Sequence, residues 1–145
     1  MERRTLIVGA GALALAGIVM GPSLIPTKAV SEARPAAALV PQEGRLVIDL
    51  REPFEWKQTG VLSGARLHSW RSAEQLVSAF GPEATEAEEI LLVCQSGNRS
   101  RRAARALAGY LDREIVDVAG GMGRLRREAD VQIVRPTPDM GCASC

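Results

Sequence analysis

The pattern of apolar and polar residues from position 45 onward predicts strands that alternate with helices. Four runs of mostly apolar residues have the length of strands, and one shorter strand is expected among them; the ranges are 45–50, 65–69, 89–94, 113–118 and 131–134. Runs this continuous are typical of strands that are covered on both faces. The alternation favours an α/β domain in which helices are layered on a largely parallel sheet.

Three helices are expected between these strands. The first follows Ser72, a residue type that caps helix N-termini, and ends at the Gly-Pro pair 81–82. The second has an apolar stripe beside a row of arginines, and it begins at Arg99 or behind a cap on Ser100. The third is short and lies behind the glycine turn within 120–129. In such domains the reactive residues are expected where a strand ends and the next helix begins.

Residues 1–33 have the layout of an export signal. A basic start is followed by an uncharged run over 5–21 and then by Pro22. The run is short for a membrane span of about 20 strongly apolar residues, so a cleaved signal is favoured over an anchor. The pair Arg3 and Arg4 resembles a twin-arginine signal, although two basic residues also suit the general secretion route.

Small residues suggest where such a signal would be removed. Cleavage is expected after Ala29 or Ala33, and 34–44 is predicted to be a linker before the domain at 45–134. We therefore expect an exported protein that is periplasmic, or anchored to the membrane and facing the periplasm. Contact with the membrane is expected only through an uncleaved N-terminal segment.

The composition narrows the range of partners and cofactors. The chain has 145 residues, which suit one domain, and its 18 Lys and Arg nearly balance its 17 Asp and Glu. This balance argues against nucleic acid as a partner and leaves small anions open through local charge. The three cysteines, Cys94, Cys142 and Cys145, are too few for a disulfide framework and lack the spacing of a complete zinc site. No metal and no cofactor are expected.

The segment that follows Cys94 carries the candidate chemistry. The cysteine ends a buried strand, and a short loop separates it from a helix, so several loop amides must turn inward around Gly97. These amides, the helix dipole and the guanidinium of Arg99 each favour the thiolate over the thiol. The sequence therefore predicts an anion cradle that holds Cys94 as a thiolate at neutral pH. An inert cysteine packed at a strand end is the alternative.

The loop CQSGNRS, which starts at Cys94, resembles the active-site loop of rhodanese domains. Three further motifs are similar to that family in the same order: the strand end DLREPFEW at 49–56, the turn SGA at 63–65 and the glycine turn GGM at 120–122. Four ordered motifs are stronger support for a family than any one of them. Together they cover nearly the whole predicted domain.

The chain departs from the rhodanese pattern in two places. Gly-Val-Leu at 60–62 stands where the family often has Gly-His-Ile, which is not expected to affect catalysis. The chain before Arg45 looks too short for the usual opening strand and helix, and this puts one edge of the sheet in question.

The resemblance implies a rhodanese-like three-layer fold and a sulfurtransferase. Cys94 would take the outer sulfur of thiosulfate or a persulfide donor, forming a persulfide of its own, and yield it to an acceptor thiol or to cyanide. Arg99 would hold the anionic donor. The other residues of the loop would bind the substrate and the persulfide: Gln95, Ser96, Gly97, Asn98 and Ser100.

Three residues outside the loop are assigned supporting parts. Asp49 and Arg51 are expected to orient neighbouring loops, with a contact between Arg51 and the substrate as the less favoured alternative. No general base is required in this scheme, so the single histidine, His68, is expected to be structural or to lie at the rim of the site.

Two other functions fit the same residues. A phosphatase of this fold also places a cysteine and an arginine around an anion, but its loop is one residue longer than the stretch 95–98 found here. The other alternative is a non-catalytic binding or sulfide-sensing module. Such a module has no physical need for a strained, thiolate-stabilising loop, which argues against it.

The last segment, 135–145, is expected to be a flexible arm that contains Cys142 and Cys145. Two prolines discourage regular structure, and both thiols lie at the very end of the chain. Such an arm can carry one thiol to Cys94 and relay its sulfur. A disulfide between the two tail cysteines, a redox pair or a metal-binding end are the alternatives.

Overall fold

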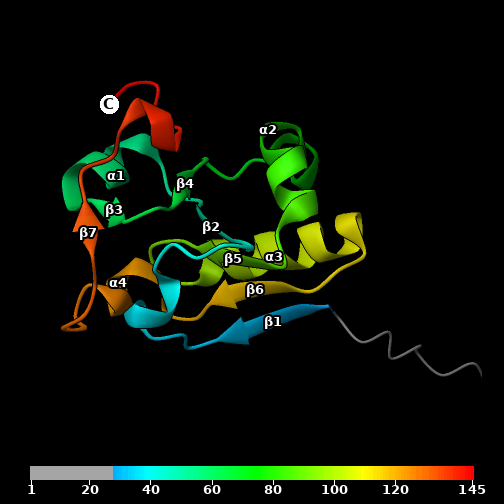
Figure 1. Cartoon of the computed structure of the whole chain (residues 1–145), viewed down its shortest axis with the longest axis horizontal. Helices are drawn as coiled ribbons and strands as arrows, with labels where there is room; N and C mark the ends of the chain where they lie inside the picture. The colour runs from blue at the N-terminus through cyan, green and yellow to red at the C-terminus, as the bar shows by residue number, and fades with distance from the viewer. Residues whose placement is uncertain (1–27) are drawn as a thin grey trace, which may run out of the picture.

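The structure, a computed structural model, describes residues 28–145. Five parallel strands form the main sheet in the order β1-β6-β5-β2-β4 (Figure 1). Their bounds are Ala29–Glu32 for β1, Arg45–Asp49 for β2, Arg66–Leu67 for β4, Glu89–Val93 for β5 and Ile115–Val118 for β6. The α/β domain with a largely parallel central sheet, expected from the sequence, is confirmed.

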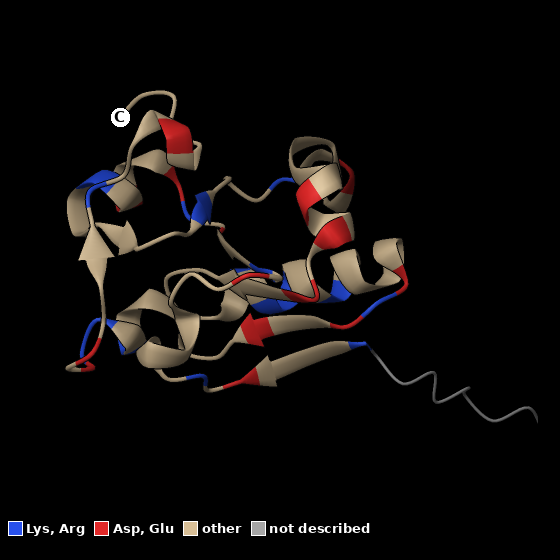
Figure 2. Cartoon of the chain, in the orientation of Figure 1, with Lys and Arg blue, Asp and Glu red and all other residues tan. Residues whose placement is uncertain are grey.

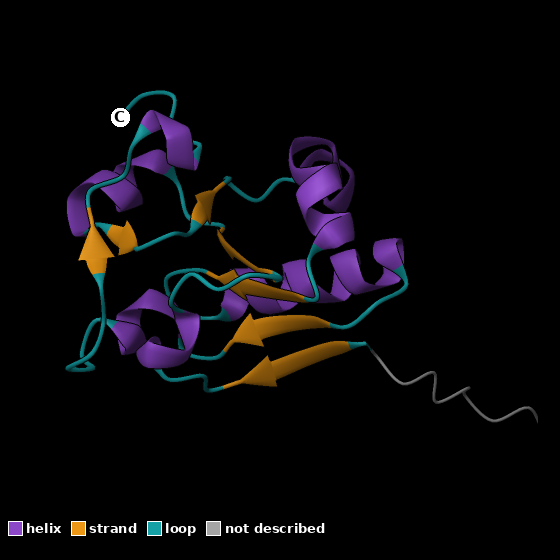
Figure 3. Cartoon of the chain, viewed as in Figure 1, coloured by secondary structure: helices purple, strands orange, loops and turns teal. Residues whose placement is uncertain are grey.

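Four α-helices and two short 3-10 helices accompany the sheet (Figure 3). The α-helices are α1 (Pro53–Thr59), α2 (Ala73–Glu86), α3 (Asn98–Leu111) and α4 (Gly121–Leu125). The 3-10 helices are η1 (Ala36–Leu39) and η2 (Pro138–Met140). A separate antiparallel pair joins β3 (Val61–Leu62) to β7 (Ile133–Val134).

Successive residues of the central strands point to opposite faces of the sheet and build two apolar layers. Ile48 and Leu92 pack with α2 and α3 on one face, where Cys94 also lies. Val47 and Val93 pack with η1 and α4 on the other face. The domain therefore has three layers, and both faces of the sheet are covered, as the continuous apolar runs indicated.

The N-terminal boundary of the domain differs from the expectation. β1 pairs with β6 at the edge of the sheet, and η1 buries Ala36 and Leu39. Residues 34–44 are therefore not a free linker, because their apolar side chains complete the layer that covers the sheet. Cleavage after Ala33 would remove β1 from the domain. The predicted export signal itself lies in 1–33, of which 1–27 are outside the described residues.

Three element boundaries also differ. α2 continues through Pro82 after a kink at Phe80, because the proline falls in the first turn of the second helical segment, where its missing N–H costs little. α3 begins at Asn98 behind Gly97 and not behind a cap on Ser100. The strand expected at 131–134 is reduced to β7, which lies outside the main sheet.

One helix was absent from the sequence prediction. α1 begins with Pro53, and a reciprocal capping box between Glu52 and Glu55 satisfies its first amides. Ser72 caps α2 as expected, accepting a hydrogen bond from the amide of Gln75. Within residues 28–145, no helix is long and apolar enough to cross a membrane.

Candidate functional site

The sulfur of Cys94 lies at the carboxyl end of β5 and is held by the loop that leads into α3. Its Sγ accepts hydrogen bonds from the amides of Gly97, at 3.2 Å, and Ser100, at 3.4 Å. The Ser100 hydroxyl lies 3.4 Å from the same sulfur. Cys94 is only 2% exposed, whereas Ser96 and Asn98 are exposed on the outer side of the loop. The amides therefore surround the sulfur from the helix side, where they favour negative charge.

The glycine turn before α4 supports this loop from behind. The amide of Met122 donates to the Cys94 carbonyl at 2.8 Å, and the amide of Gly123 donates to the Gln95 carbonyl at 2.9 Å. A Cβ on Gly121, which has a φ of +52°, would lie 2.2 Å from the Cys94 carbonyl oxygen. The turn can approach the reactive loop this closely only because Gly121 has no side chain.

Arg99 contacts the ends of other elements and makes no hydrogen bond to Cys94 within the described residues. Its Nη1 donates to the Leu50 carbonyl and to the Glu55 carboxylate, both at 3.0 Å. Its side chain is 29% exposed, and no described residue accepts from Nε or Nη2. One edge of the guanidinium is thus fixed by the protein, and the remaining donors are available to an anion.

Asp49 and Arg51 form a completely buried ion pair at the end of β2. The guanidinium donates to both carboxylate oxygens, and its other donors reach the Thr59 hydroxyl and the Gly60 carbonyl at 2.7 Å. These contacts join β2 to the end of α1, and they engage the N–H donors on both arms of the Arg51 guanidinium. The structure therefore places Arg51 within the support of α1, with no surface left for a substrate.

Asp117 and Ser31 adjoin the site, and neither is among the site residues expected from the sequence. Asp117 on β6 is 1% exposed, and its two carboxylate oxygens accept hydrogen bonds from the hydroxyls of Ser100 and Ser31. Ser31 belongs to β1, the strand that the sequence analysis assigned to the signal region. A charged residue inside the apolar strand IVDV is the signal that could have revealed Asp117.

Helices α2 and α3 carry charged residues of opposite sign. α3 carries four arginines and no acidic residue, whereas α2 carries three glutamates and no basic residue (Figure 2). Near Arg99, hydrogen bonds from Arg71 hold the pKa of Glu52 below its ordinary value, and the charges of Arg71 and Arg99 act in the same direction. The loop therefore sits at the start of a cationic helix, a setting that favours anions.

A comparison with protein families identifies the domain. The model of the rhodanese-like domain family matches residues 32–128, which contain β2 to α4 and the Cys94 loop. The chain belongs to the rhodanese-like domain family. The match includes the four motifs on which the resemblance rested. A comparison with curated proteins finds no significant match.

Two solved structures are similar to this rhodanese-like chain. A protein of unknown function from Rhodopseudomonas palustris, described as a possible tyrosine phosphatase, has a TM-score of 0.53 and 21% identity over 63% of this chain and 72% of its own. A rhodanese-like domain protein from Staphylococcus aureus has a TM-score of 0.44 and 19% identity over 73% of this chain and 97% of its own. Identities this low concern the fold and carry no information about substrates.

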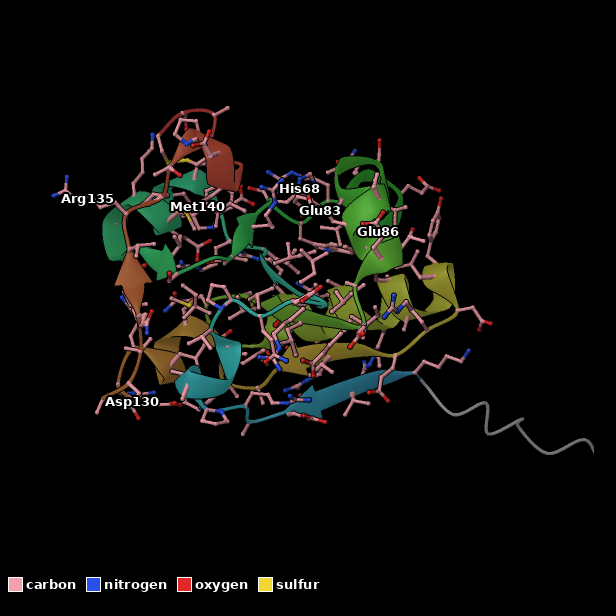
Figure 4. The ribbon with its side chains drawn as sticks, in the orientation of Figure 1. His68, Glu83, Glu86, Asp130, Arg135 and Met140 are labelled. Carbon is pink, nitrogen blue, oxygen red and sulfur yellow. A yellow bond between two sulfur atoms is a disulfide. The ribbon has the colours of Figure 1, made fainter. Side chains whose placement is uncertain are left out.

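The tail of the rhodanese-like chain is packed and not the free arm that its composition predicted. Cys142 is 1% exposed among Trp56, Val61 and Leu67, and it forms a disulfide with Cys145. The carbonyl of Asp139 also accepts a hydrogen bond from Arg66 at 2.9 Å. Met140 and Arg135 mark this segment, which lies beside α1 (Figure 4). The disulfide and the apolar contacts fix the tail, so the structure gives the expected sulfur relay no mobile thiol.

His68 lies on the side of the domain that faces α2 (Figure 4). Its ring packs edge-on against Phe80, with centroids 5.6 Å apart, and its Nε2 has no hydrogen-bond partner in the described chain. Burial lowers its pKa, and the positive charge of Arg71 lowers it further.

Residues 28–145 contain no cluster of three or more His, Cys, Asp or Glu side chains that could hold a metal ion.

Proposed function

We propose that this protein is a sulfurtransferase that carries sulfur as a persulfide on Cys94. The observation that carries the proposal is the pair of amides, from Gly97 and Ser100, that converge on the cysteine sulfur. A sulfur atom surrounded by donors is stabilised as an anion, and a thiolate is the nucleophile that such chemistry needs. A binding module would gain nothing from donors aimed at a buried sulfur.

The reaction has two balanced steps. In the first, the Cys94 thiolate attacks the outer sulfur of thiosulfate, a bond between the two sulfurs forms, and sulfite leaves with the electron pair of the broken bond. In the second, an acceptor thiolate or cyanide attacks the outer sulfur of the persulfide, and the Cys94 thiolate leaves. Neither step requires a metal or a general base.

The loop and Arg99 hold the charge that moves during these steps. The amides of Ser96, Asn98 and Arg99 have no acceptor among the described residues, so they are available to the outer sulfur of the persulfide. The free edge of Arg99 is available to the anionic half of the donor, while Glu55 fixes its other edge. Because these donors are already oriented, binding the anion requires little rearrangement.

A phosphatase is the second candidate, because one structural neighbour is described as a possible tyrosine phosphatase. Only four residues separate Cys94 from Arg99, namely Gln95, Ser96, Gly97 and Asn98. A ring of amides this small suits a single sulfur atom better than a tetrahedral phosphate. We therefore rank phosphoryl transfer second.

Assays with both substrate classes on one preparation separate the two functions. We expect turnover of thiosulfate with cyanide or a thiol as acceptor, and no turnover of an aryl phosphate. Cys94→Ser should abolish sulfur transfer and keep the fold, because a serine hydroxyl is too weak a nucleophile toward sulfur. Hydrolysis of the phosphate without sulfur transfer would reverse the assignment.

We also propose that the protein works outside the cytoplasm. The disulfide between Cys142 and Cys145 supports this proposal, since such bonds persist mainly in oxidising compartments. Fractionation of cells tests it, and changing both Arg3 and Arg4 to Lys tests the route. Retained export of that variant would favour general secretion over the twin-arginine route, which reads the guanidinium pair.

A further inference from the structure

A series of three side chains, Ser100, Asp117 and Ser31, links the reactive sulfur to β1 at the edge of the sheet. The Ser100 hydroxyl lies 3.4 Å from the Cys94 sulfur and also contacts a carboxylate oxygen of Asp117. The second carboxylate oxygen accepts from the Ser31 hydroxyl at 2.7 Å. Cys94, Ser100 and Asp117 are each at most 2% exposed, so water does not compete for the contacts among these three residues, whereas Ser31 is exposed.

The Ser100 hydroxyl has a single hydrogen, so it can donate to Asp117 or to Cys94 but not to both. If Asp117 is ionised, the hydroxyl donates to it and presents only lone pairs to Cys94, an arrangement that favours a Cys94 thiol donating to Ser100. If Asp117 is protonated, it donates to Ser100, and the hydroxyl hydrogen turns to a Cys94 thiolate. The two arrangements contain the same number of protons and differ by a shift of one proton along each link.

We propose that Asp117 stores the proton of Cys94, so that the two residues share one negative charge through Ser100. When the thiolate forms, the S–H bond breaks, the proton passes to the Ser100 oxygen, and the former hydroxyl proton passes to Asp117. Asp117 is thus a positioning residue that acts through Ser100. The proposal deepens the proposed function, because the thiolate that it supplies is the attacking group of sulfur transfer.

Positively charged side chains lie close to Asp117. Arg101 on α3 lies 3.6 Å from one of its oxygens, and Arg105 lines the same surface hollow between β1 and α3. A carboxylate at Asp117 attracts these arginines and repels a thiolate at Cys94, because like charges repel. The hollow also gives the buried carboxyl group a route for proton exchange with solvent.

Alkylation of Cys94 with iodoacetamide measures the stored proton. The chain has three cysteines, two of them in the disulfide, so Cys94 is the only free thiol. Alkylation forms an S–C bond and expels iodide, after which Asp117 no longer faces a thiolate and ionises. Two quantities are measured on the full chain at neutral pH: the thiolate fraction from ultraviolet absorbance, and the protons released per alkylated Cys94 from an indicator dye.

The sum of the two quantities decides the proposal. For an isolated cysteine, the protons released equal the thiol fraction, so the sum is about one at every pH. If Cys94 and Asp117 share one proton, alkylation releases about one proton whether that proton was on the thiol or on the carboxyl group. The sum then exceeds one by the thiolate fraction. We expect an excess in the parent, and a sum of about one in both Asp117→Asn and Ser100→Ala.

The controls keep this result distinct from the fate of the proposed function. Asp112→Asn changes an aspartate whose side chain is 93% exposed and should keep the excess of the parent. A parent sum of about one overturns the proposal without any variant, as does an excess that survives in both Asp117→Asn and Ser100→Ala. The readout needs no sulfur donor, so an excess without sulfur transfer would contradict the proposed function alone.

Discussion

Two cysteines of this domain are equally buried and differ in everything that surrounds their sulfurs. Cys94, 2% exposed, lies against backbone amides and a hydroxyl at the start of a cationic helix. Cys142, 1% exposed, lies against apolar side chains and is bonded to Cys145. Burial alone therefore does not decide what a cysteine does. Donors around the sulfur favour a reactive thiolate, whereas apolar neighbours and a disulfide favour a structural role.

Among changes that leave Cys94 itself in place, the largest expected effect comes from disturbing the support of its loop. In Gly121→Ala the new Cβ would meet the Cys94 carbonyl oxygen at 2.2 Å in a backbone conformation that alanine disfavours. We expect kcat/KM for thiosulfate to fall by about a hundredfold or more, because small displacements of reacting groups are this costly. Steady-state kinetics on the folded variant measure the loss.

Gly109→Ala is the matched control, because nothing lies within 4 Å of its new Cβ on the exposed side of α3. It should keep the activity of the parent and gain about 0.5–1 kcal/mol of stability. Equal activity in the two alanine variants would show that the glycine turn does not position the loop.

Arg99→Ala should weaken the use of anionic donors more than that of neutral polysulfides. The change removes the donors that hold the anion, so kcat/KM for thiosulfate is expected to fall by about tenfold to a hundredfold. Parallel kinetics with both donors measure the difference. Arg102→Ala, an exposed arginine on the same helix, should have little effect on either. Equal losses for both donors in Arg99→Ala would rule out a role in holding the anion.

A variant without the two tail cysteines tests the structural role that the comparison gives to Cys142. Replacing Cys142 and Cys145 together by Ala removes the disulfide and should lower the free energy of unfolding by about 2 kcal/mol, as expected for a cross-link that closes a short loop. Denaturant unfolding measures this loss. Sulfur transfer by Cys94 should stay within about twofold of the parent, since the tail supplies no group to the site. A large loss of transfer with an unchanged Cys94 loop would restore the relay.

The smallest expected effect is a pH dependence at His68, which packs against Phe80 of α2. Burial lowers its pKa in the folded state below the unfolded value of about 6.5. Its contribution to stability is therefore present above about pH 6.5 and is lost as the pH falls through the folded pKa. His68→Gln should flatten this part of the stability curve, and an unchanged slope would contradict the assignment.

The sequence was sufficient for the Cys94 loop because its determinants are local. A buried strand, a short loop with Gly97 and a helix follow one another within a few residues, and the strand-helix alternation predicted the parallel sheet. It was insufficient for α1, although Pro53 and the Glu52–Glu55 capping box were readable signals. Those residues also belong to the family motif DLREPFEW, so their helix-start signal is easily overlooked.

The other features that the sequence did not predict depend on contacts between distant parts of the chain. β1 has only four residues, and its strand state depends on pairing with β6, which no local pattern reveals. Cys142 becomes buried because α1 and β4 form an apolar surface for it, and Gly141 lets the tail approach Leu67 closely. Asp117 becomes part of the site only because α3 and β1 bring two hydroxyls to it.

The most direct test of the central claim is the mass of the intact protein after treatment with thiosulfate and removal of the excess reagent. The account predicts that the mass rises by that of one sulfur atom, that peptide mapping places this sulfur on Cys94, and that cyanide removes it. The Cys94→Ser variant should gain nothing, while the variant without the tail cysteines should gain the same sulfur as the parent. An unchanged mass in the parent, or a sulfur carried by Cys142 or Cys145, would contradict the account.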